Sequence, residues 1–247
     1  MSDKSSGMSD ASSIDGSGST ARFSLPVLIF VWLGAFLVAN VISAVVFGAS
    51  GAVSGEEPIW VVGLSALGLW IPFLGALWAV SVRLGSGSFV RDYAIAFRSV
   101  DLVGIPIGVA SQLVFVNLVY LPLRAVFPDT FSADRVENRA RDLFDRAHGG
   151  WLVVLILVVV VGAPIVEEIV YRGFINGSLQ GQLGDGVALV VAAAWFALIH
   201  FAPVEYPGLF VFAIVLGLCF LRTRRLGLPI MAHMAFNATG LILVAGK

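Results

Sequence analysis

The chain has 247 residues, of which 58% are hydrophobic and only 13% are charged, and its mean hydropathy is +0.94. Soluble globular domains contain about 25% charged and about 45–50% apolar residues, so this composition excludes most soluble classes and predicts a polytopic membrane protein. The net charge of −1 gives no electrostatic basis for binding nucleic acid. A single cysteine, Cys219, excludes a disulfide framework or a four-cysteine zinc site within the chain.

The chain begins with a polar segment and continues with apolar ones. Residues 1–22 are mostly Ser, Gly and Asp, which predicts a disordered cytoplasmic tail. Windows of about 20 apolar residues then predict membrane spans, and these are helical because backbone polar groups in lipid must bond within the chain. The expected fold is an all-α, polytopic transmembrane helical bundle of about seven spans. These are residues 24–47, 59–82, 101–123, 151–180, 184–203, 206–222 and 227–246.

The distribution of arginines predicts the orientation. Short cytoplasmic loops are rich in Lys and Arg. Three arginines follow the second span and three follow the sixth, whereas the loop after the first span contains only glutamates as charged residues. We therefore expect a multi-pass protein of the cell membrane with a cytoplasmic N-terminus. The segment 124–149, with five Arg and five acidic residues, falls on the other side and is interpreted as an interfacial helix.

Ionisable residues inside the spans are concentrated after residue 160. Such residues are costly in lipid and commonly mark function. In the fourth span, Glu168 and Arg172 are separated by four positions and can form an ion pair on one helix face, which we interpret as structural. Glu167 points about 100° away from Glu168 and needs a partner in another helix.

Counting residues locates that partner. Gly184 and Asp185 are the expected turn between the fourth and fifth spans. Glu167 and His200 lie about 16 residues on either side of this turn, so at 1.5 Å per residue they reach the same depth and are expected to meet. Phe196 shares a helix face with His200. His233 and Asn237 likewise share a face of the seventh span.

This set of side chains permits two kinds of chemistry. A carboxylate beside an imidazole can act as a general base toward water, and His233 and Asn237 can donate hydrogen bonds to a developing oxyanion. Together they describe hydrolysis of an amide. Glu167, His200 and His233 could instead bind zinc or another divalent metal. The residue types fit both alternatives.

Three motifs carry a family resemblance. Glu167-Glu168-xxx-Arg172, Phe196-xxx-His200 and His233-xxx-Asn237 occur in this order on separate apolar spans. This arrangement resembles the CPBP intramembrane endopeptidase family, which includes CAAX prenyl proteases and bacteriocin-processing or immunity-type proteins. The similarity covers about residues 120–245.

The resemblance implies a role for each matching residue. Glu167 and His200 would activate water, His233 and Asn237 would stabilise the oxyanion, and Glu168 and Arg172 would support the site. The family is filed under metallopeptidases, but we favour a metal-free mechanism without a cofactor. The implied substrate is a membrane-associated protein or peptide, either a CAAX-type protein or a peptide precursor.

The corresponding division of the chain is a tail (1–22), N-terminal transmembrane helices (23–119) and a protease core (120–247). Two other functions remain open: a transporter or proton relay that uses the same buried Glu and His groups, and a membrane scaffold in which a GxxxG motif, Gly104 to Gly108, helps helices to associate.

Overall fold

A computed structural model describes residues 23–246, so the predicted tail lies outside the described residues. Every regular element in this range is helical, which confirms the all-α prediction. The α-helices are α1 (Leu25–Ser50), α2 (Ile59–Leu84), α3 (Phe89–Asp92), α4 (Gly104–Ala110), α5 (Val116–Val126), α6 (Ala133–Arg146), α7 (Gly150–Ile156), α8 (Ala163–Glu168), α9 (Gly177–Leu198), α10 (Tyr206–Thr223) and α11 (Gly227–Ala245). A 3-10 helix, η1 (Ser99–Val103), and three π-helical segments, η2 (Ser111–Phe115), η3 (Leu157–Gly162) and η4 (Ile169–Asn176), continue directly into neighbouring α-helices.

Six helices in the described range are long and apolar enough to cross a membrane, which makes this a multi-pass membrane protein. Five of them match five of the predicted spans. The sixth range, Gly150–Leu198, covers both predicted spans 151–180 and 184–203, which meet at a kink at Gly184. The difference arises because no loop separates the two segments.

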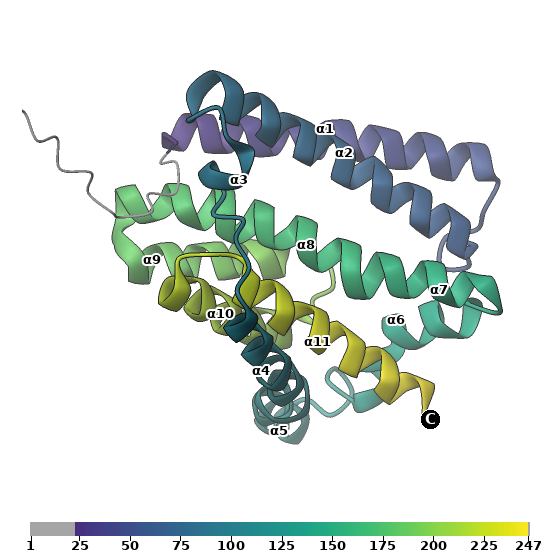
Figure 1. Ribbon diagram of the computed structural model, residues 1–247. Coiled ribbons are helices and arrows are strands. Elements are labelled where there is room, and N and C mark those ends of the chain that lie inside the picture. Colours follow the sequence, from purple (N-terminus) through teal and green to yellow (C-terminus); the bar gives the residue numbers. More distant parts are fainter. Residues whose placement is uncertain (1–22, 247) are drawn as a thin grey trace, which may run out of the picture.

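The chain reverses direction at Gly184, which divides this range into two helical arms. Gly184 has φ 76° and ψ 164°, a conformation open essentially only to glycine. The Tyr171 and Phe196 rings, which precede and follow it, pack edge-to-face with centroids 5.1 Å apart. The turn predicted at Gly184 is therefore confirmed, and Figure 1 shows the green ribbon folding back there. The second arm ends at Leu198, so His200 lies in the turn after α9 and not within a span, which corrects the predicted end at residue 203.

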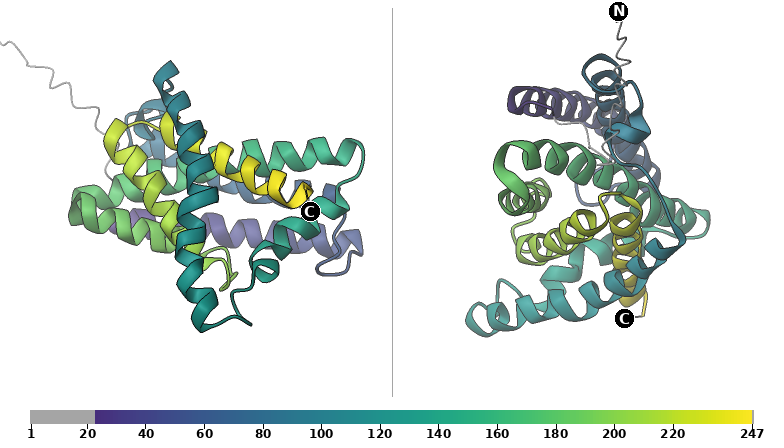
Figure 2. Two further views of the ribbon diagram at one scale, coloured as in Figure 1. Left: turned by 90° about the horizontal axis from the view of Figure 1, so that it is seen from below. Right: turned by 60° about the vertical axis from the view of Figure 1, so that its left-hand side comes forward.

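The helices pack in layers around this hairpin. α1 and α2 lie along one side of α8, η4 and α9, and the segment α4–η2–α5 crosses α11 on the opposite side (Figures 1 and 2). The main core joins the α1–α2 layer to the hairpin, for example where the ring centroids of Trp32 in α1 and Trp195 in α9 lie 5.0 Å apart. The predicted boundary between residues 119 and 120 falls inside α5 and stays a prediction about organisation.

The GxxxG motif brings α4 close to α11. A Cβ atom added to Gly104 would lie 2.6 Å from the Leu228 carbonyl oxygen, and one added to Gly108 would collide with the Ala232 carbonyl. These glycines let the two backbones approach closely. The motif therefore packs helices within the chain and fixes the helix that contains His233.

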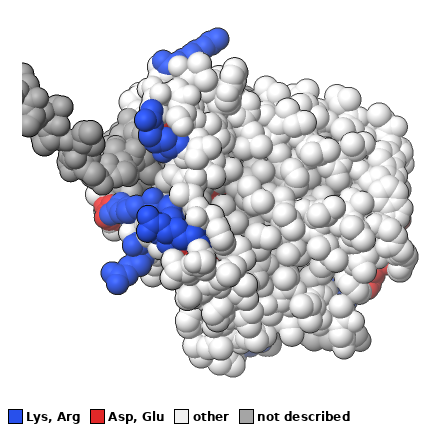
Figure 3. Space-filling model, in the orientation of Figure 1, with Lys and Arg blue, Asp and Glu red and all other residues white. Residues whose placement is uncertain are grey.

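Ion pairs show which loops share a side of the molecule. Arg146, the last residue of α6, donates hydrogen bonds to the backbone carbonyl and the carboxylate of Glu57 in the loop after α1. At the other end, Arg224 pairs with Asp185 at 2.6 Å, and Arg225 pairs with Asp101 at 2.6 Å. The pKa of Arg225 is raised by its hydrogen bonds to the Asp101 carboxylate. Arg side chains gather at this second end in Figure 3, in agreement with the predicted grouping of the loops.

Candidate active site

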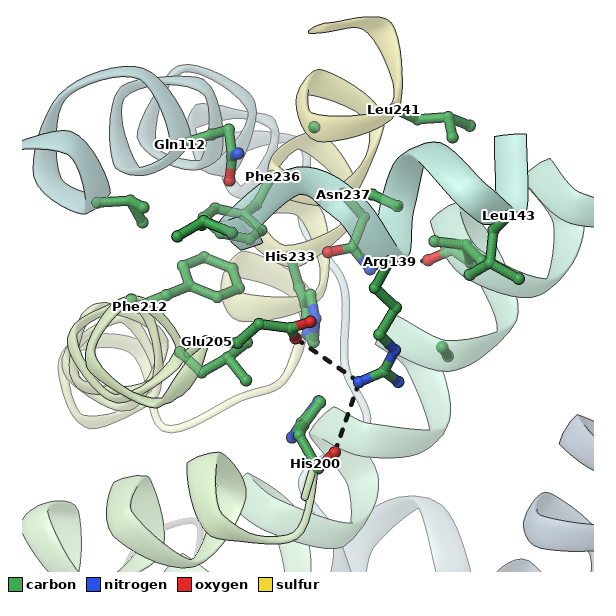
Figure 4. A pocket seen from close by; sticks show the side chains of 18 of the residues that line it. Gln112, Arg139, Leu143, His200, Glu205, Phe212, His233, Phe236, Asn237 and Leu241 are labelled. Atoms are coloured by element: carbon green, nitrogen blue, oxygen red, sulfur yellow. Dashed lines mark hydrogen bonds and ion pairs between the residues drawn. The ribbon is translucent and has the colours of Figure 1, made fainter. Parts of the chain in front are cut away.

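All four predicted catalytic side chains line one cavity of about 330 Å³. Glu167 comes from the end of α8, His200 from the turn after α9, and His233 and Asn237 from α11. Phe196, from the last turn of α9, also contributes to the wall. Figure 4 shows His233 and Asn237 on one helix with His200 approaching from another segment. The structure thus brings together residues that are up to 70 positions apart in sequence.

The two adjacent glutamates occupy different environments. They end α8, directly before the π-helical segment η4, and π-helical turns frequently occur at functional sites. Successive residues of a helix point about 100° apart. Accordingly, the Glu168 side chain is fully buried, whereas the Glu167 side chain keeps 25% of its surface exposed. Glu167 is the glutamate that faces the cavity.

Glu168 is the centre of a buried polar network. Its Oε1 atom accepts a hydrogen bond from Arg172 Nη1 at 2.9 Å and lies 2.8 Å from His233 Nδ1. Arg172 also donates from Nη2 to the Ala213 carbonyl at 3.1 Å, and its guanidinium lies over the Phe196 ring. The predicted Glu168–Arg172 pair is present, and it connects η4 with α9, α10 and α11. A buried charge needs such partners, because an unpaired one is strongly destabilising.

His233 lies between the two glutamates. Its Nδ1 atom faces Glu168, and its Nε2 atom is 3.8 Å from Glu167 Oε2. The ring packs edge-on against Phe196 and Phe212, with centroids 5.9 and 5.2 Å away. These contacts fix the imidazole on both sides. The partner nearest to Glu167 is therefore His233, which the depth argument had not identified.

His200 and Asn237 are each fixed by a backbone carbonyl. His200 Nδ1 lies 2.7 Å from the Phe196 carbonyl, and Asn237 Nδ2 donates to the Val159 carbonyl at 2.8 Å. A carbonyl can only accept, so Nδ1 of His200 carries the hydrogen, and Nε2 of the neutral ring keeps a lone pair. Glu167 and His200 share the cavity, but no recorded hydrogen bond or ion pair joins them.

Three polar residues of the cavity were missed by sequence reasoning. Arg139 of α6 pairs with Glu205 at 3.6 Å and reaches the His200 carbonyl at 3.5 Å (Figure 4). Arg139 and Glu205 lie outside the predicted spans. A search for charged residues inside the spans therefore does not find them. Gln112 of η2 enters the cavity from another side. It is uncharged, although a polar amide in an apolar span could have drawn attention to it.

The zinc alternative for Glu167, His200 and His233 stays a prediction. Within residues 23–246, no group of three or more His, Cys, Asp or Glu side chains is arranged to hold a metal ion. Glu167, His200 and His233 line the same cavity without forming such a group. The Nδ1 atoms of both histidines are directed at Glu168 and at the Phe196 carbonyl, so a metal would have to bind their Nε2 atoms, as is usual for histidine ligands.

The comparisons with known proteins support the motif assignment. Residues 149–239 match the family model described as "Type II CAAX prenyl endopeptidase Rce1-like". The chain is also 24% identical over 201 residues to "Putative membrane peptidase YdiL" of Bacillus subtilis, an alignment that covers 80% of this chain and 78% of the relative. No solved structure matches the chain. The matched segment supplies the glutamate, histidine and asparagine side chains of the cavity, and the comparisons support the similarity of the chain to the CPBP family of intramembrane proteases.

Proposed function

We propose that this protein is an intramembrane endopeptidase that hydrolyses a peptide bond with a water molecule activated by Glu167 and His200. The observation that carries the proposal is the shared cavity, in which a partly exposed carboxylate faces two histidines and an asparagine. General-base catalysis requires a carboxylate or imidazole that can reach the water. Glu167 is accessible, whereas Glu168 is occupied by Arg172 and His233.

The proposed reaction transfers one proton from water to the leaving group. Glu167 accepts a proton from the water molecule while the water oxygen attacks the carbonyl carbon of the scissile bond. The lone pair on His200 Nε2 orients the same water through its second hydrogen. When the tetrahedral intermediate collapses, the C–N bond breaks and Glu167 returns the proton to the departing amine, so the enzyme ends in its initial state.

The developing oxyanion needs hydrogen-bond donors that are fixed in advance. Asn237 is held through its bond to the Val159 carbonyl, and the second hydrogen of its amide is available. His233 can donate hydrogen bonds from Nε2 and Nδ1 at the same time only when its ring is an imidazolium, in which case Nδ1 donates to Glu168. The contact of Nδ1 with Glu168 holds the ring in place. In this role Glu168 and Arg172 act as positioning residues.

The substrate is proposed to be a membrane-associated protein or peptide, either a CAAX-type protein or a peptide precursor. The name of the matching family model supports the first class. The direct test is cleavage of a panel of labelled peptides, some of them prenylated, by the purified protein, with Glu167→Ala as the inactive control. Cleavage that persists in Glu167→Ala preparations would contradict the proposal.

Activity is expected to survive exhaustive chelation. If Glu167 and His200 activate water without a metal, a strong chelator leaves turnover unchanged, and elemental analysis finds less than one metal ion per chain. A zinc-dependent enzyme would lose activity on metal removal and regain it on readdition, because the ion generates the nucleophile. One zinc per chain that disappears together with activity in His200→Ala and His233→Ala would contradict the metal-free mechanism.

We propose that the arginine-rich end of the molecule faces the cytoplasm, because short cytoplasmic loops carry an excess of Lys and Arg. A cysteine introduced in the loop 224–226 should then react only with membrane-permeant reagents. A cysteine introduced at 52–55 should also react with impermeant ones. The native Cys219 is buried, so labelling of the protein without an introduced cysteine measures the background for both experiments. The opposite labelling pattern would invert the orientation.

A further inference from the structure

Gln112 is a polar residue in an apolar segment. It lies within the membrane-spanning helix Ser99–Val126, and the three residues after it, Leu113, Val114 and Phe115, are exposed at the lipid-facing surface of the chain. Gln112 itself is half-buried and lines the cavity. An amide without a hydrogen-bond partner in such surroundings costs free energy. Its presence therefore calls for an explanation.

The neighbouring polar side chains satisfy themselves, and Gln112 does not. Ser111 donates to the Ile107 carbonyl at 2.7 Å, and Asn117 donates to the Leu113 carbonyl at 3.1 Å. The Gln112 amide makes no hydrogen bond with any residue in 23–246. It is instead directed into the cavity from the π-helical segment η2 (Figure 4). A π-helical turn changes the direction in which a side chain points, and such turns often occur at functional sites.

Gly240 of α11 shows at which level of that helix the Gln112 side chain lies. A Cβ atom added to Gly240 would lie 3.6 Å from Gln112 Nε2, so the amide packs against the backbone of α11 at that glycine. Gly240 is seven residues after His233, which corresponds to about 10 Å along the helix axis. An extended peptide advances about 3.3 Å per residue. The distance from His233 to Gln112 thus corresponds to about three residues of substrate.

We infer that Gln112 is a substrate-binding residue, which hydrogen-bonds the main chain of an extended peptide about three residues from the scissile bond. This inference rests on the proposed peptidase function. A primary amide offers both donors and an acceptor, so it can pair with the N–H and C=O groups that every peptide presents, whatever its side chains. Substrate binding then supplies the partner that the chain itself does not.

The test compares Gln112→Met with Asn117→Leu. Both substitutions remove an amide from the same helix and leave an apolar side chain of similar length, but only Gln112 lines the cavity. With the peptide cleaved fastest in the panel, Gln112→Met should raise KM about three- to tenfold, the effect of one net hydrogen bond, with little change in kcat. Asn117→Leu should leave both constants unchanged. An unchanged KM in Gln112→Met would overturn the inference.

Peptide length provides the second readout. The same peptide is shortened one residue at a time from each end. Removal of the peptide residue that contacts Gln112, the third from the scissile bond, should abolish the difference. The wild type and Gln112→Met should then bind the shortened peptide with equal affinity. A difference that persists in every shortened peptide would place the role of Gln112 elsewhere and overturn the inference.

Binding measured without hydrolysis separates this inference from the proposed function. Labelled peptide is titrated onto Glu167→Gln protein with and without Gln112→Met. Weaker binding in the double variant supports the Gln112 contact even if the wild type cleaves nothing, an outcome that would count against the peptidase function alone. Equal binding, or no peptide binding to either protein, would overturn the Gln112 contact.

Discussion

Glu167→Gln is expected to lower peptide hydrolysis by about 100- to 10,000-fold, the range attributed to a positioned general base. The amide keeps the size of the carboxylate but cannot accept the proton of the attacking water. Folding should be unaffected, because Glu167 is partly exposed and its recorded ion-pair contact is the 3.8 Å approach of His233 Nε2. Initial rates with the labelled peptide and thermal unfolding in detergent measure the two effects.

The adjacent glutamate provides a matched control. Glu168→Gln makes the same chemical change one residue away, but there it removes the charge that balances Arg172 and faces His233. We expect this variant to lose thermal stability as well as rate, whereas Glu167→Gln loses rate alone. Turnover near the wild-type level in Glu167→Gln would remove Glu167 as the base.

Much of the architecture could be predicted because lipid imposes strict rules. Apolar segments of sufficient length must be helical, so the helices α1, α2, α10 and α11 appear close to their predicted ends. The turn at Gly184 was predictable because glycine, unlike other residue types, readily adopts the positive φ found there. Placing Glu167 and His200 at equal distances from that turn was enough to put them on one cavity.

The remaining features depend on packing that no local pattern encodes. The π-helical segments η2, η3 and η4 insert into apolar helices whose composition is unremarkable for an α-helix. The early end of α9 places His200 in a turn, where its Nδ1 meets the Phe196 carbonyl. The approach of His233 to both glutamates depends on how α11 packs against α8. Such contacts are set by tertiary structure and not by residue spacing.

Arg172→Ala should mainly affect stability. Removing the guanidinium leaves the Glu168 carboxylate buried without its cationic partner, and breaking a buried pair in this way costs roughly 3–5 kcal/mol. Arg172 also loses its bond to the Ala213 carbonyl and its contact with Phe196. The expected result is low expression or a clearly reduced unfolding temperature in detergent, and any loss of activity should follow from loss of folded protein.

An exposed ion pair serves as the control for this prediction. Arg224 pairs with Asp185 at 2.6 Å, but about half of each side chain is exposed to solvent. Arg224→Ala should therefore cost less than about 1 kcal/mol. Neutralising the partner should also distinguish the two cases: adding Glu168→Gln to Arg172→Ala removes the uncompensated charge and is expected to restore part of the lost stability. If Arg172→Ala is instead as stable as the wild type and inactive, the guanidinium takes a direct part in the reaction, and the role of a positioning residue is wrong.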